Sequence, residues 1–420
     1  MKYLKMHDLL RDLCLKEAEK ERFYHVVGQH NSLGTSIQRR VVIMRSSPED
    51  KVVDALKSRP YARTCIIDCT RYKPLPSSKL LRTLKAWDED NDQGGYEYSV
   101  ENLFELVNLR FLDVKSDMYL RLPSSINLLW SLQTLIVDYP IIEVIHAPVE
   151  IWNMSQLRHI HLWSGEIHLP DPPSDSIVVM ENLQTLEGVK NFKFDERMVR
   201  RMPNVKKLGL KYDGIESSDD DCCVHNIKHL QKLESLQCFS YPGANFLQKL
   251  TFLHSVKIKS LFLQLPHGRR MEDILEKVST LPHLQKLILI GGDFTTGKWE
   301  TVEGQFLSLK YLNLSCGGLE CWTMESSHFP CLEHLYVLVS NDMKEIPAEL
   351  GEIPTLKSVT LYNCSESATK SAKRMAEEQQ DLQGEELTFR VTIHLHNDED
   401  SDELLKLATP NFNVVKRLTR

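Results

Sequence analysis

Two histidines on one predicted strand are the side chains of this sequence best placed for metal chemistry. His159 and His161 are separated by one residue, so a strand would present both imidazoles on the same face. Zinc usually takes three or four protein ligands, and the sequence places no third ligand beside them. His394 and His396 repeat the spacing without adding a ligand. We therefore expect no metal ion in this chain.

Sequence motifs for catalysis are missing as well. The chain has no Gly-x-Ser-x-Gly, no His-Glu-x-x-His and no Gly-x-x-x-x-Gly-Lys-Ser/Thr. These motifs would supply a nucleophile, a zinc-activated water or a phosphate-binding loop. The glycine pairs Gly291-Gly292 and Gly317-Gly318 follow predicted strands, where a turn between repeats explains them. The sequence therefore does not predict an enzyme.

A leucine repeat predicts the strands that position the side chains of this sequence. The unit is Leu-x-x-Leu-x-Leu, with Ile or Val allowed. Copies begin at Leu81, Leu109, Leu132, Leu157, Leu183, Val205, Leu233, Leu253, Leu284, Leu309, Leu332 and Leu356. All spacings lie within the roughly 20–29 residues of leucine-rich repeats, except the 31 residues from Leu253 to Leu284. Each unit supplies one strand whose apolar face is buried only when neighbours stack.

The repeat predicts an α/β fold, a leucine-rich-repeat solenoid shaped as a horseshoe with a parallel sheet on its concave face. We expect about 12–14 irregular repeats over residues 38–378. Residues 1–27 carry apolar side chains at helical spacing, which predicts a helix within an N-terminal segment, residues 1–37. A polar helix over residues 365–380 closes the repeats, and residues 379–420 form a cap and tail.

Composition and charge restrict the partners and the compartment. The 420 residues include 26% charged side chains, with a formal net charge of −7, so the chain lacks the basic balance typical of nucleic-acid binding. No run of about 18 apolar residues predicts a membrane span, and the charged start predicts no signal peptide. The ten cysteines show no regular pairing. We expect reduced thiols in a cytoplasmic protein, with or without peripheral membrane association.

Alternation along the strands predicts a protein-binding surface. The third, fifth and seventh positions of each repeat should point out of the concave face. The candidate partner-binding residues there are His159, His161, Trp163, Lys207, Lys211, Lys257, Lys259, Tyr311, Asn313, His334, Tyr336 and Tyr362, with Ile288 and Ile290 beside them. Trp163 is the strongest single candidate, because tryptophan is enriched in binding hot spots. The alternative is that Trp163 packs on the next repeat.

A motif near the start of the chain resembles a known family. Met6-His7-Asp8 begins the predicted helix, continues as Leu-Leu-Arg-Asp-Leu-Cys14, and precedes degenerate leucine-rich repeats. This string resembles plant intracellular nucleotide-binding leucine-rich-repeat immune receptors of the coiled-coil class, particularly late-blight-resistance-type proteins. The segments Glu345–Leu356 and Ala376–Gln380 are similar to the close of the repeats in that family.

The resemblance implies a role for the N-terminal motif. Residues 1–37 would be a remnant of the winged-helix nucleotide switch. His7 would contact the ADP phosphate and Asp8 would stabilise it, provided that the nucleotide-binding domain is present. An imidazole can donate such a hydrogen bond. The alternative is that both are ordinary polar residues at a helix start. We expect no cofactor in this chain by itself, whereas the full-length family binds ADP or ATP.

The resemblance also implies a function. The chain would be a non-enzymatic recognition and autoinhibition module that detects a pathogen effector or a guarded host protein and triggers defence with a hypersensitive response. Its first repeats would dock on the nucleotide-binding and coiled-coil domains of a full-length receptor. The alternative is a free-standing cytosolic leucine-rich-repeat scaffold or adaptor in signalling or ubiquitin-ligase targeting.

Overall fold

The computed structural model describes most of the chain. The described residues are 8–21, 23–27, 38–44, 46–67, 79–86, 105–115, 122–138, 144–162, 165–173, 178–213, 223–241, 246–339, 342–383, 389–395 and 405–416. Contacts divide the chain into two units. The first unit is Met1–Lys190 with Arg200–Asn204, and the second is Asn191–Val199 with Val205–Arg420.

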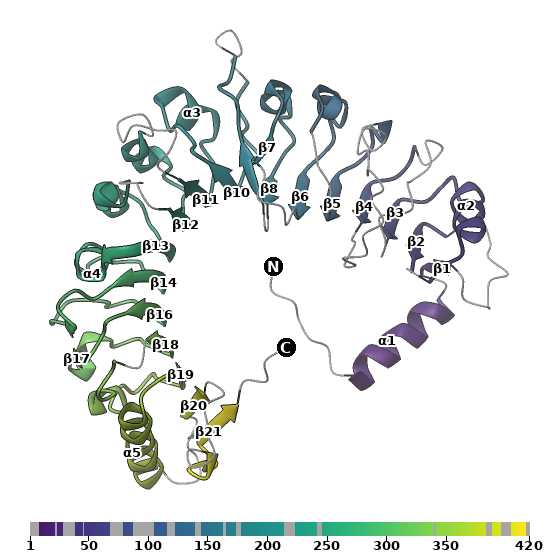
Figure 1. Ribbon diagram of the computed structural model, residues 1–420. Coiled ribbons are helices and arrows are strands. Elements are labelled where there is room, and N and C mark those ends of the chain that lie inside the picture. Colours follow the sequence, from purple (N-terminus) through teal and green to yellow (C-terminus); the bar gives the residue numbers. More distant parts are fainter. Residues whose placement is uncertain are drawn as a thin grey trace. The chain divides into compact units, whose positions relative to one another are not determined.

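The first unit is a ladder of short parallel strands (Figure 1). Its order is α1 (Asp8–Lys20), β1 (His25–Val27), β2 (Arg40–Ile43), α2 (Glu49–Lys57), β3 (Thr64–Ile67), β4 (Thr83–Ala86), β5 (Phe111–Lys115), β6 (Thr134–Asp138), β8 (His159–Leu162) and β10 (Thr185–Lys190). Each of these strands pairs in parallel with the next. The short strands β7 (Val144–His146) and β9 (Glu166–His168) pair with each other, and β9 joins β10.

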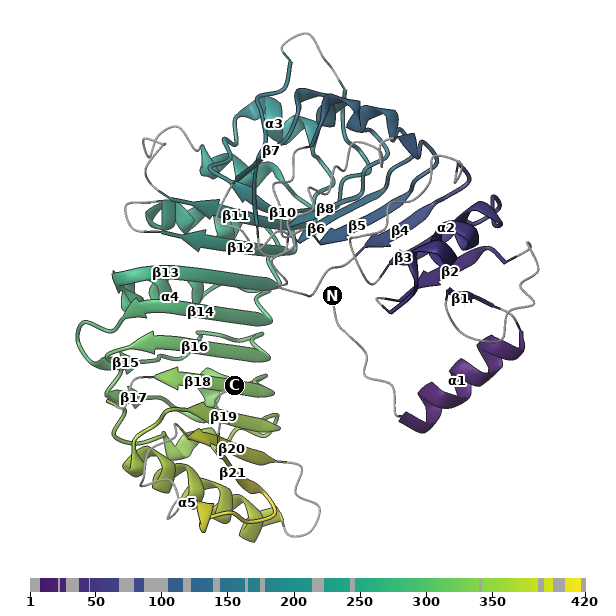
Figure 2. The ribbon, with the colours of Figure 1, turned by 45° about the vertical axis from the view of Figure 1, so that its right-hand side comes forward.

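The second unit continues the same pattern. Its ladder contains β11 (Lys207–Tyr212), β12 (Ser235–Ser240), β13 (Ser260–Arg270), β14 (Lys286–Asp293), β16 (Tyr311–Gly317), β18 (His334–Val339), β19 (Ser358–Tyr362), β20 (Arg390–Leu395) and β21 (Phe412–Lys416). Figure 2 shows these parallel strands side by side. A separate pair, β15 (Lys298–Glu300) and β17 (Cys321–Thr323), forms a two-stranded parallel sheet.

Helices and turns return the chain from one strand to the next. Besides α4 (Met271–Val278) and α5 (Glu366–Gln383), they include α3 (Glu196–Arg201) and the 3-10 segments η2 (Ser124–Leu128), η3 (Val149–Asn153), η4 (Val224–His229), η5 (Phe246–Ser255), η6 (Ser326–His328) and η7 (Ala348–Leu350). Proline precedes η2, η3 and η7, because its fixed φ suits the start of a helical turn. Within each unit the strands lie on one side of the repeats, and the helices and 3-10 segments lie on the other side (Figure 1).

Stacked leucines form the core between the two sides. In the second unit Leu287, Leu312 and Leu335 lie opposite one another on β14, β16 and β18, and each is 0% exposed. Leu135 in the first unit is 1% exposed. Each buried leucine stabilises the fold by roughly 1.5–3 kcal/mol relative to an exposed one. The predicted leucine-rich-repeat architecture is therefore confirmed.

The N-terminal helix is shorter than the sequence predicts. The apolar spacing predicts a helix over residues 1–27, but α1 ends at Lys20 and His25–Val27 form strand β1. Val27 is 3% exposed, and β1 pairs with β2 in the repeat ladder. The β-branched pair Val26-Val27 favours a strand, and burial against β2 outweighs the helical spacing of the apolar residues. Strands β1, β20 and β21 lie outside residues 38–378, the range predicted for the repeats.

One repeat has a different register from the predicted one. Leu253 lies in η5, and the strand of this repeat begins at Ser260. Leu261 pairs with Leu236 and Leu287, so Ile258 takes the first position of the motif. The spacings then become 25 residues from Leu233 and 26 residues to Leu284. The irregular spacing of 31 residues therefore came from an incorrect start point.

Candidate functional site

The exposed strand face of the first unit is polar, and its charges are largely paired. The Lys85 ammonium lies 3.6 Å from the Asp113 carboxylate, and the Lys190 ammonium lies 3.3 Å from that of Glu166. Asp113 is buried, with 6% exposure. A buried carboxylate requires such a partner, because an unpaired charge is costly to desolvate. These side chains therefore hold neighbouring strands together.

The two histidines of β8 do point out of the sheet, as predicted. His159 Nδ1 lies 3.0 Å from the Thr185 hydroxyl, and His161 Nδ1 contacts the Glu187 carboxylate, both on β10. Each imidazole is therefore in contact with the next repeat. The described residues contain no group of three His, Cys, Asp or Glu side chains that could hold a metal. Trp163 lies outside the described residues.

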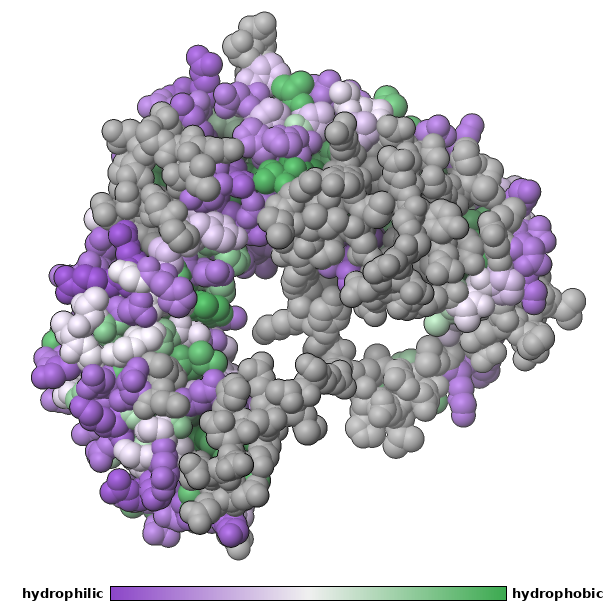
Figure 3. All heavy atoms as spheres, viewed as in Figure 1, coloured by the Kyte–Doolittle hydropathy of each residue, from purple (hydrophilic) through white to green (hydrophobic). Residues whose placement is uncertain are grey.

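The second unit presents a different surface on its strands. We call this surface the aromatic face. It comprises Lys211, Phe239, Phe262, Ile288, Ile290, Tyr311, Tyr336 and Tyr362, all half-buried, from β11 to β19. Their alternation with buried leucines, such as Leu312 next to Tyr311, follows from the period of two along a strand. Figure 3 shows hydrophobic atoms gathered along this strand side of the unit, with hydrophilic atoms prevailing on the outer side.

Rings of neighbouring repeats contact one another across the aromatic face. The rings of Phe239 and Phe262 lie 5.0 Å apart, and those of Tyr311 and Tyr336 lie 5.1 Å apart. Tyr362 stacks on the His394 imidazole of β20 at 4.4 Å. Ring separations of about 4.5–7 Å are favourable for aromatic pairs. These ring contacts restrict the side chains before any partner arrives, which lowers the entropic cost of binding.

Cations border these rings. The Lys211 ammonium lies 5.4 Å from the centre of the Phe239 ring, and the Lys286 ammonium lies 4.9 Å from that of Tyr311. Both distances fall within the range of a cation–π contact, about 6 Å. Burial raises the pKa of the Tyr311 phenol, and the phenols of Tyr336 and Tyr362 add to this shift. Tyr311 is therefore a neutral hydrogen-bond donor at physiological pH.

The remaining predicted residues fall into two groups. Lys207, Asn313 and His334 take outward positions on β11, β16 and β18, and His334 Nδ1 lies 2.8 Å from the Ser358 hydroxyl. The prediction was wrong for Lys257 and Lys259, which precede β13 because of the shifted register. The Lys259 ammonium instead lies 3.1 Å from the Glu234 carboxylate.

The N-terminal motif cannot be placed in a site. His7 lies outside the described residues, and Asp8 is the first residue of α1, with no described side chain. Its proposed phosphate contact stays a prediction.

Two residues of the aromatic face, and Lys286 at its border, escaped the sequence prediction. Phe262 was missed because the register of its repeat was misplaced. Phe239 and Lys286 were missed because outward positions were not assigned in every copy of the repeat. The sequence nevertheless contains the signal that would have identified these three residues, because each lies two, four or six residues after the first position of its repeat. Phe239 is six residues beyond Leu233, and Lys286 two beyond Leu284.

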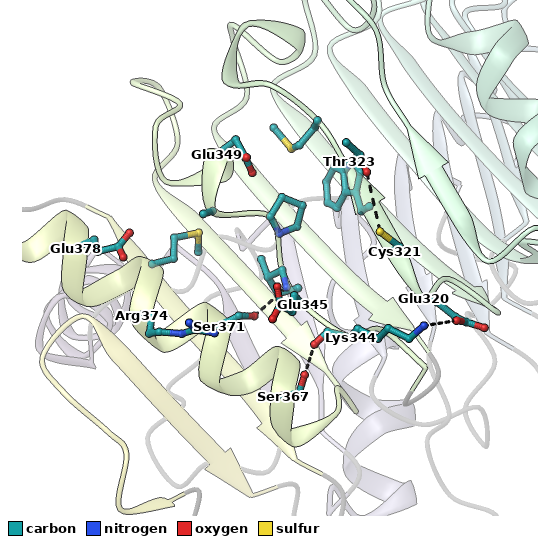
Figure 4. Close-up of a pocket in the computed structure, with 16 residues that line it drawn as sticks. Glu320, Cys321, Thr323, Lys344, Glu345, Glu349, Ser367, Ser371, Arg374 and Glu378 are labelled. Atoms are coloured by element: carbon teal, nitrogen blue, oxygen red, sulfur yellow. Dashed lines mark hydrogen bonds and ion pairs between the residues drawn. The ribbon is translucent and has the colours of Figure 1, made fainter.

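A groove between β17 and α5 is a second concavity of this unit (Figure 4). Its volume is about 670 Å³, and buried Trp322, Met324 and Met375 form part of its lining. The Lys344 ammonium on its rim lies 2.8 Å from the Glu320 carboxylate, and Ser371 accepts a hydrogen bond from the backbone N–H of Ile346. The polar groups of each of these two pairs satisfy one another.

The family follows from the repeat geometry and from comparison with known sequences. Residues 62–403 match the family described as leucine-rich repeat region. The chain is a leucine-rich-repeat protein. Its described residues include no helix long and apolar enough to traverse a bilayer.

Relatives of this leucine-rich-repeat protein include proteins of Solanum demissum. It is 26% identical over 415 residues to a putative late blight resistance protein homolog of that species, covering 94% of this chain and 52% of the relative. A second relative, a late blight resistance protein of the same species, is 26% identical over 419 residues, covering 90% of this chain and 30% of the relative. The chain thus spans about half, or less, of these relatives.

Solved structures that match this chain include the leucine-rich-repeat ectodomain of the plant membrane receptor kinase GASSHO1/SCHENGEN3 from Arabidopsis thaliana. It matches with a TM-score of 0.41 and 15% identity, over 86% of this chain and 46% of that chain.

Proposed function

We propose that this leucine-rich-repeat protein is the recognition module of a plant disease-resistance protein, and that its aromatic face binds a protein partner. The observation that carries the proposal is the face of paired rings and bordering lysines from β11 to β19. Aromatic side chains dominate binding hot spots, and charged groups at their border favour a specific partner. The similarity to late blight resistance proteins supports a role in defence.

The partner would be a pathogen effector or a host protein that the resistance protein guards. In the same proposal the module restrains signalling until that partner binds, through contacts with nucleotide-binding and coiled-coil domains. Such a switch needs a partner that binds the released state more tightly than the restrained one. Preformed rings on a rigid sheet suit this role, because little binding energy is spent on ordering them.

A cytoplasmic location fits the chemistry of the cysteines. The eight cysteines of the described residues are free thiols, as expected in a reducing compartment. Burial raises the pKa of the Cys65 and Cys364 thiols to about 12. These buried thiols are therefore unreactive and act as small core residues.

The test is a defence assay in plants that express this protein with Phe262→Ala and Tyr336→Ala. We expect the response to the matching pathogen to be lost, since both rings lie half-exposed on the aromatic face. The matched control is Leu307→Ala with Leu382→Ala, which removes apolar side chains that are 54% and 78% exposed and lie outside this face.

Equal melting temperatures of the two double variants would show that the fold is retained. An unchanged defence response in the aromatic double variant would contradict the proposal. A captured partner that proves to be a ubiquitin-ligase component would favour the scaffold alternative instead.

A further inference from the structure

A column of arginines lies at one edge of the first unit, where each strand begins. The residue before each of the strands β2, β3, β4 and β5 is an arginine: Arg39, Arg63, Arg82 and Arg110. Backbone hydrogen bonds of 2.7–2.8 Å join each of them to the next. Neighbouring strands lie about 4.8 Å apart, so the four side chains start from adjacent rungs. After Gln133, Arg158 continues the column before β8.

These arginines have no anionic partner in the described structure. None of the four guanidinium groups forms an ion pair or side-chain hydrogen bond with a described residue. The adjacent residues in the sequence carry no carboxylate either: Gln38, Ala62, Leu81 and Leu109 precede the four arginines, and Arg40, Thr64, Thr83 and Phe111 follow them. The charges of Arg39 and Arg82 lower the pKa of Arg63. The column is therefore self-repelling.

The residues that precede the strands of the second unit form an equivalent column, joined by the same kind of backbone hydrogen bond. There the equivalent residues, apart from the neutral Gln285, alternate in sign from Lys206 to Lys357. Glu234 pairs with Lys259 at 3.1 Å, and Glu333 pairs with Lys310 at 3.2 Å and with Lys357 at 2.6 Å. The repeat ladder can therefore carry opposite charges on the residues that precede neighbouring strands. The first unit keeps like charges instead, at a cost in repulsion.

Exposed apolar side chains accompany the arginines. Tyr61 lies two residues before Arg63 and is 60% exposed, and Trp130 lies three residues before Gln133 and is 66% exposed. Leu80 is 44% exposed at the equivalent place. Arginine, tyrosine and tryptophan are the residue types most enriched in protein-binding hot spots. The formal net charge of −7 repels nucleic acid over long range. The combination therefore favours a protein ligand.

We infer that this edge of the first unit is a docking surface for an acidic segment of a partner protein that also carries apolar side chains. Each guanidinium fork can hold a carboxylate through two parallel hydrogen bonds, while Tyr61 and Trp130 pack against the apolar side chains of the segment. The surface is separate from the aromatic face, so the inference does not depend on the proposed function.

The test uses the full chain and a short fluorescent peptide of glutamate, leucine and alanine, with a glutamine-for-glutamate peptide as its counterpart. Anisotropy should show binding of the glutamate peptide only, weakened as salt screens the charges. Arg63→Gln with Arg82→Gln and Arg110→Gln should weaken binding by at least about tenfold, since three charge-assisted contacts are lost.

The matched control removes three positive charges from the same column of the second unit: Lys259→Gln, Lys310→Gln and Lys357→Gln. This variant should change the affinity by less than about twofold, because those charges are already paired. Trp130→Ala should also weaken binding, which a purely electrostatic attraction would not require. Phe262→Ala with Tyr336→Ala should leave it unchanged.

Equal weakening by both triple variants, or no binding of the glutamate peptide, would overturn the inference. So would preferential binding of a single-stranded oligonucleotide, or displacement of the peptide by inorganic triphosphate with no effect of Trp130→Ala. Arg63→Gln should not lower the melting temperature, because it removes repulsion. A lower melting temperature would mean that the arginines serve the fold and would also overturn the inference.

Discussion

Two glycines with nearly the same positive φ should respond very differently to alanine. Gly291 and Gly268 have φ of +76° and +77°, so either substitution forces an L-residue into the left-handed region at a cost of about 1–2 kcal/mol. Their surroundings differ. A Cβ on Gly291 would lie 2.1 Å from the backbone oxygen of Leu265, whereas one on Gly268 would meet nothing within 4 Å.

The contact at Gly291 cannot be relieved by moving a side chain. Leu265 pairs with Gly291 between β13 and β14, so the two strands must separate or one must shift. We expect Gly268→Ala to destabilise the protein by about 1–2 kcal/mol. We expect Gly291→Ala to cost well over about 3 kcal/mol, since backbone strain adds to the conformational cost.

Urea denaturation of the two variants and the parent protein measures the difference. The hydrogen-exchange protection of β13 and β14 should fall in Gly291→Ala and not in Gly268→Ala. Equal midpoints for the two variants would refute the reasoning, because conformation alone would then account for both costs. A lower urea slope for Gly291→Ala would show that the strands have already opened in the folded state.

Three further predictions concern the core, the effect of pH and nucleotide binding. Leu312→Ala removes a 0% exposed side chain and should cost roughly 2–5 kcal/mol, with hydrogen-exchange protection lost mainly in adjacent repeats; a uniform loss would contradict stacked units. Burial first, and then the charge of Arg59, lower the pKa of His25 from its usual 6.5, so stability should decrease as the pH falls below this value. His25→Gln should flatten the pH dependence between about pH 7 and pH 5, and an equally steep curve would count against it. Calorimetry should detect no ADP binding to the chain by itself, because one histidine cannot replace a loop of backbone donors around a phosphate; micromolar binding would refute this.

The leucine spacing predicted the fold because each repeat buries the same positions. Leu112, Leu135 and Ile160 face one another in register, as their place in the motif requires. The prediction failed where two apolar series overlap. Leu253-Val256-Ile258 fits the motif as well as Ile258-Leu261-Leu263 does, and only pairing with Leu236 and Leu287 decides between them.

The candidate site was harder to predict, because its contacts join distant residues. The period of two along a strand placed Tyr311 and Tyr336 at outward positions, but the contact between their rings depends on the register of two repeats. The contact of His161, a predicted partner-binding residue, with Glu187 of the next repeat depends on that register in the same way. The arginines of the first unit are 19 to 28 residues apart in the sequence, so no local window reveals the column.

The central claim, that the aromatic face binds a protein, can be tested by photo-crosslinking at single positions. A photoreactive phenylalanine analogue at Phe262 fills the same place on β13, and the same analogue at Glu349, on η7, is the control. We predict that extracts of challenged plant tissue give a discrete crosslinked protein from position 262, and that Tyr336→Ala abolishes it. A crosslink of equal yield from position 349, or one that survives Tyr336→Ala, would contradict the account.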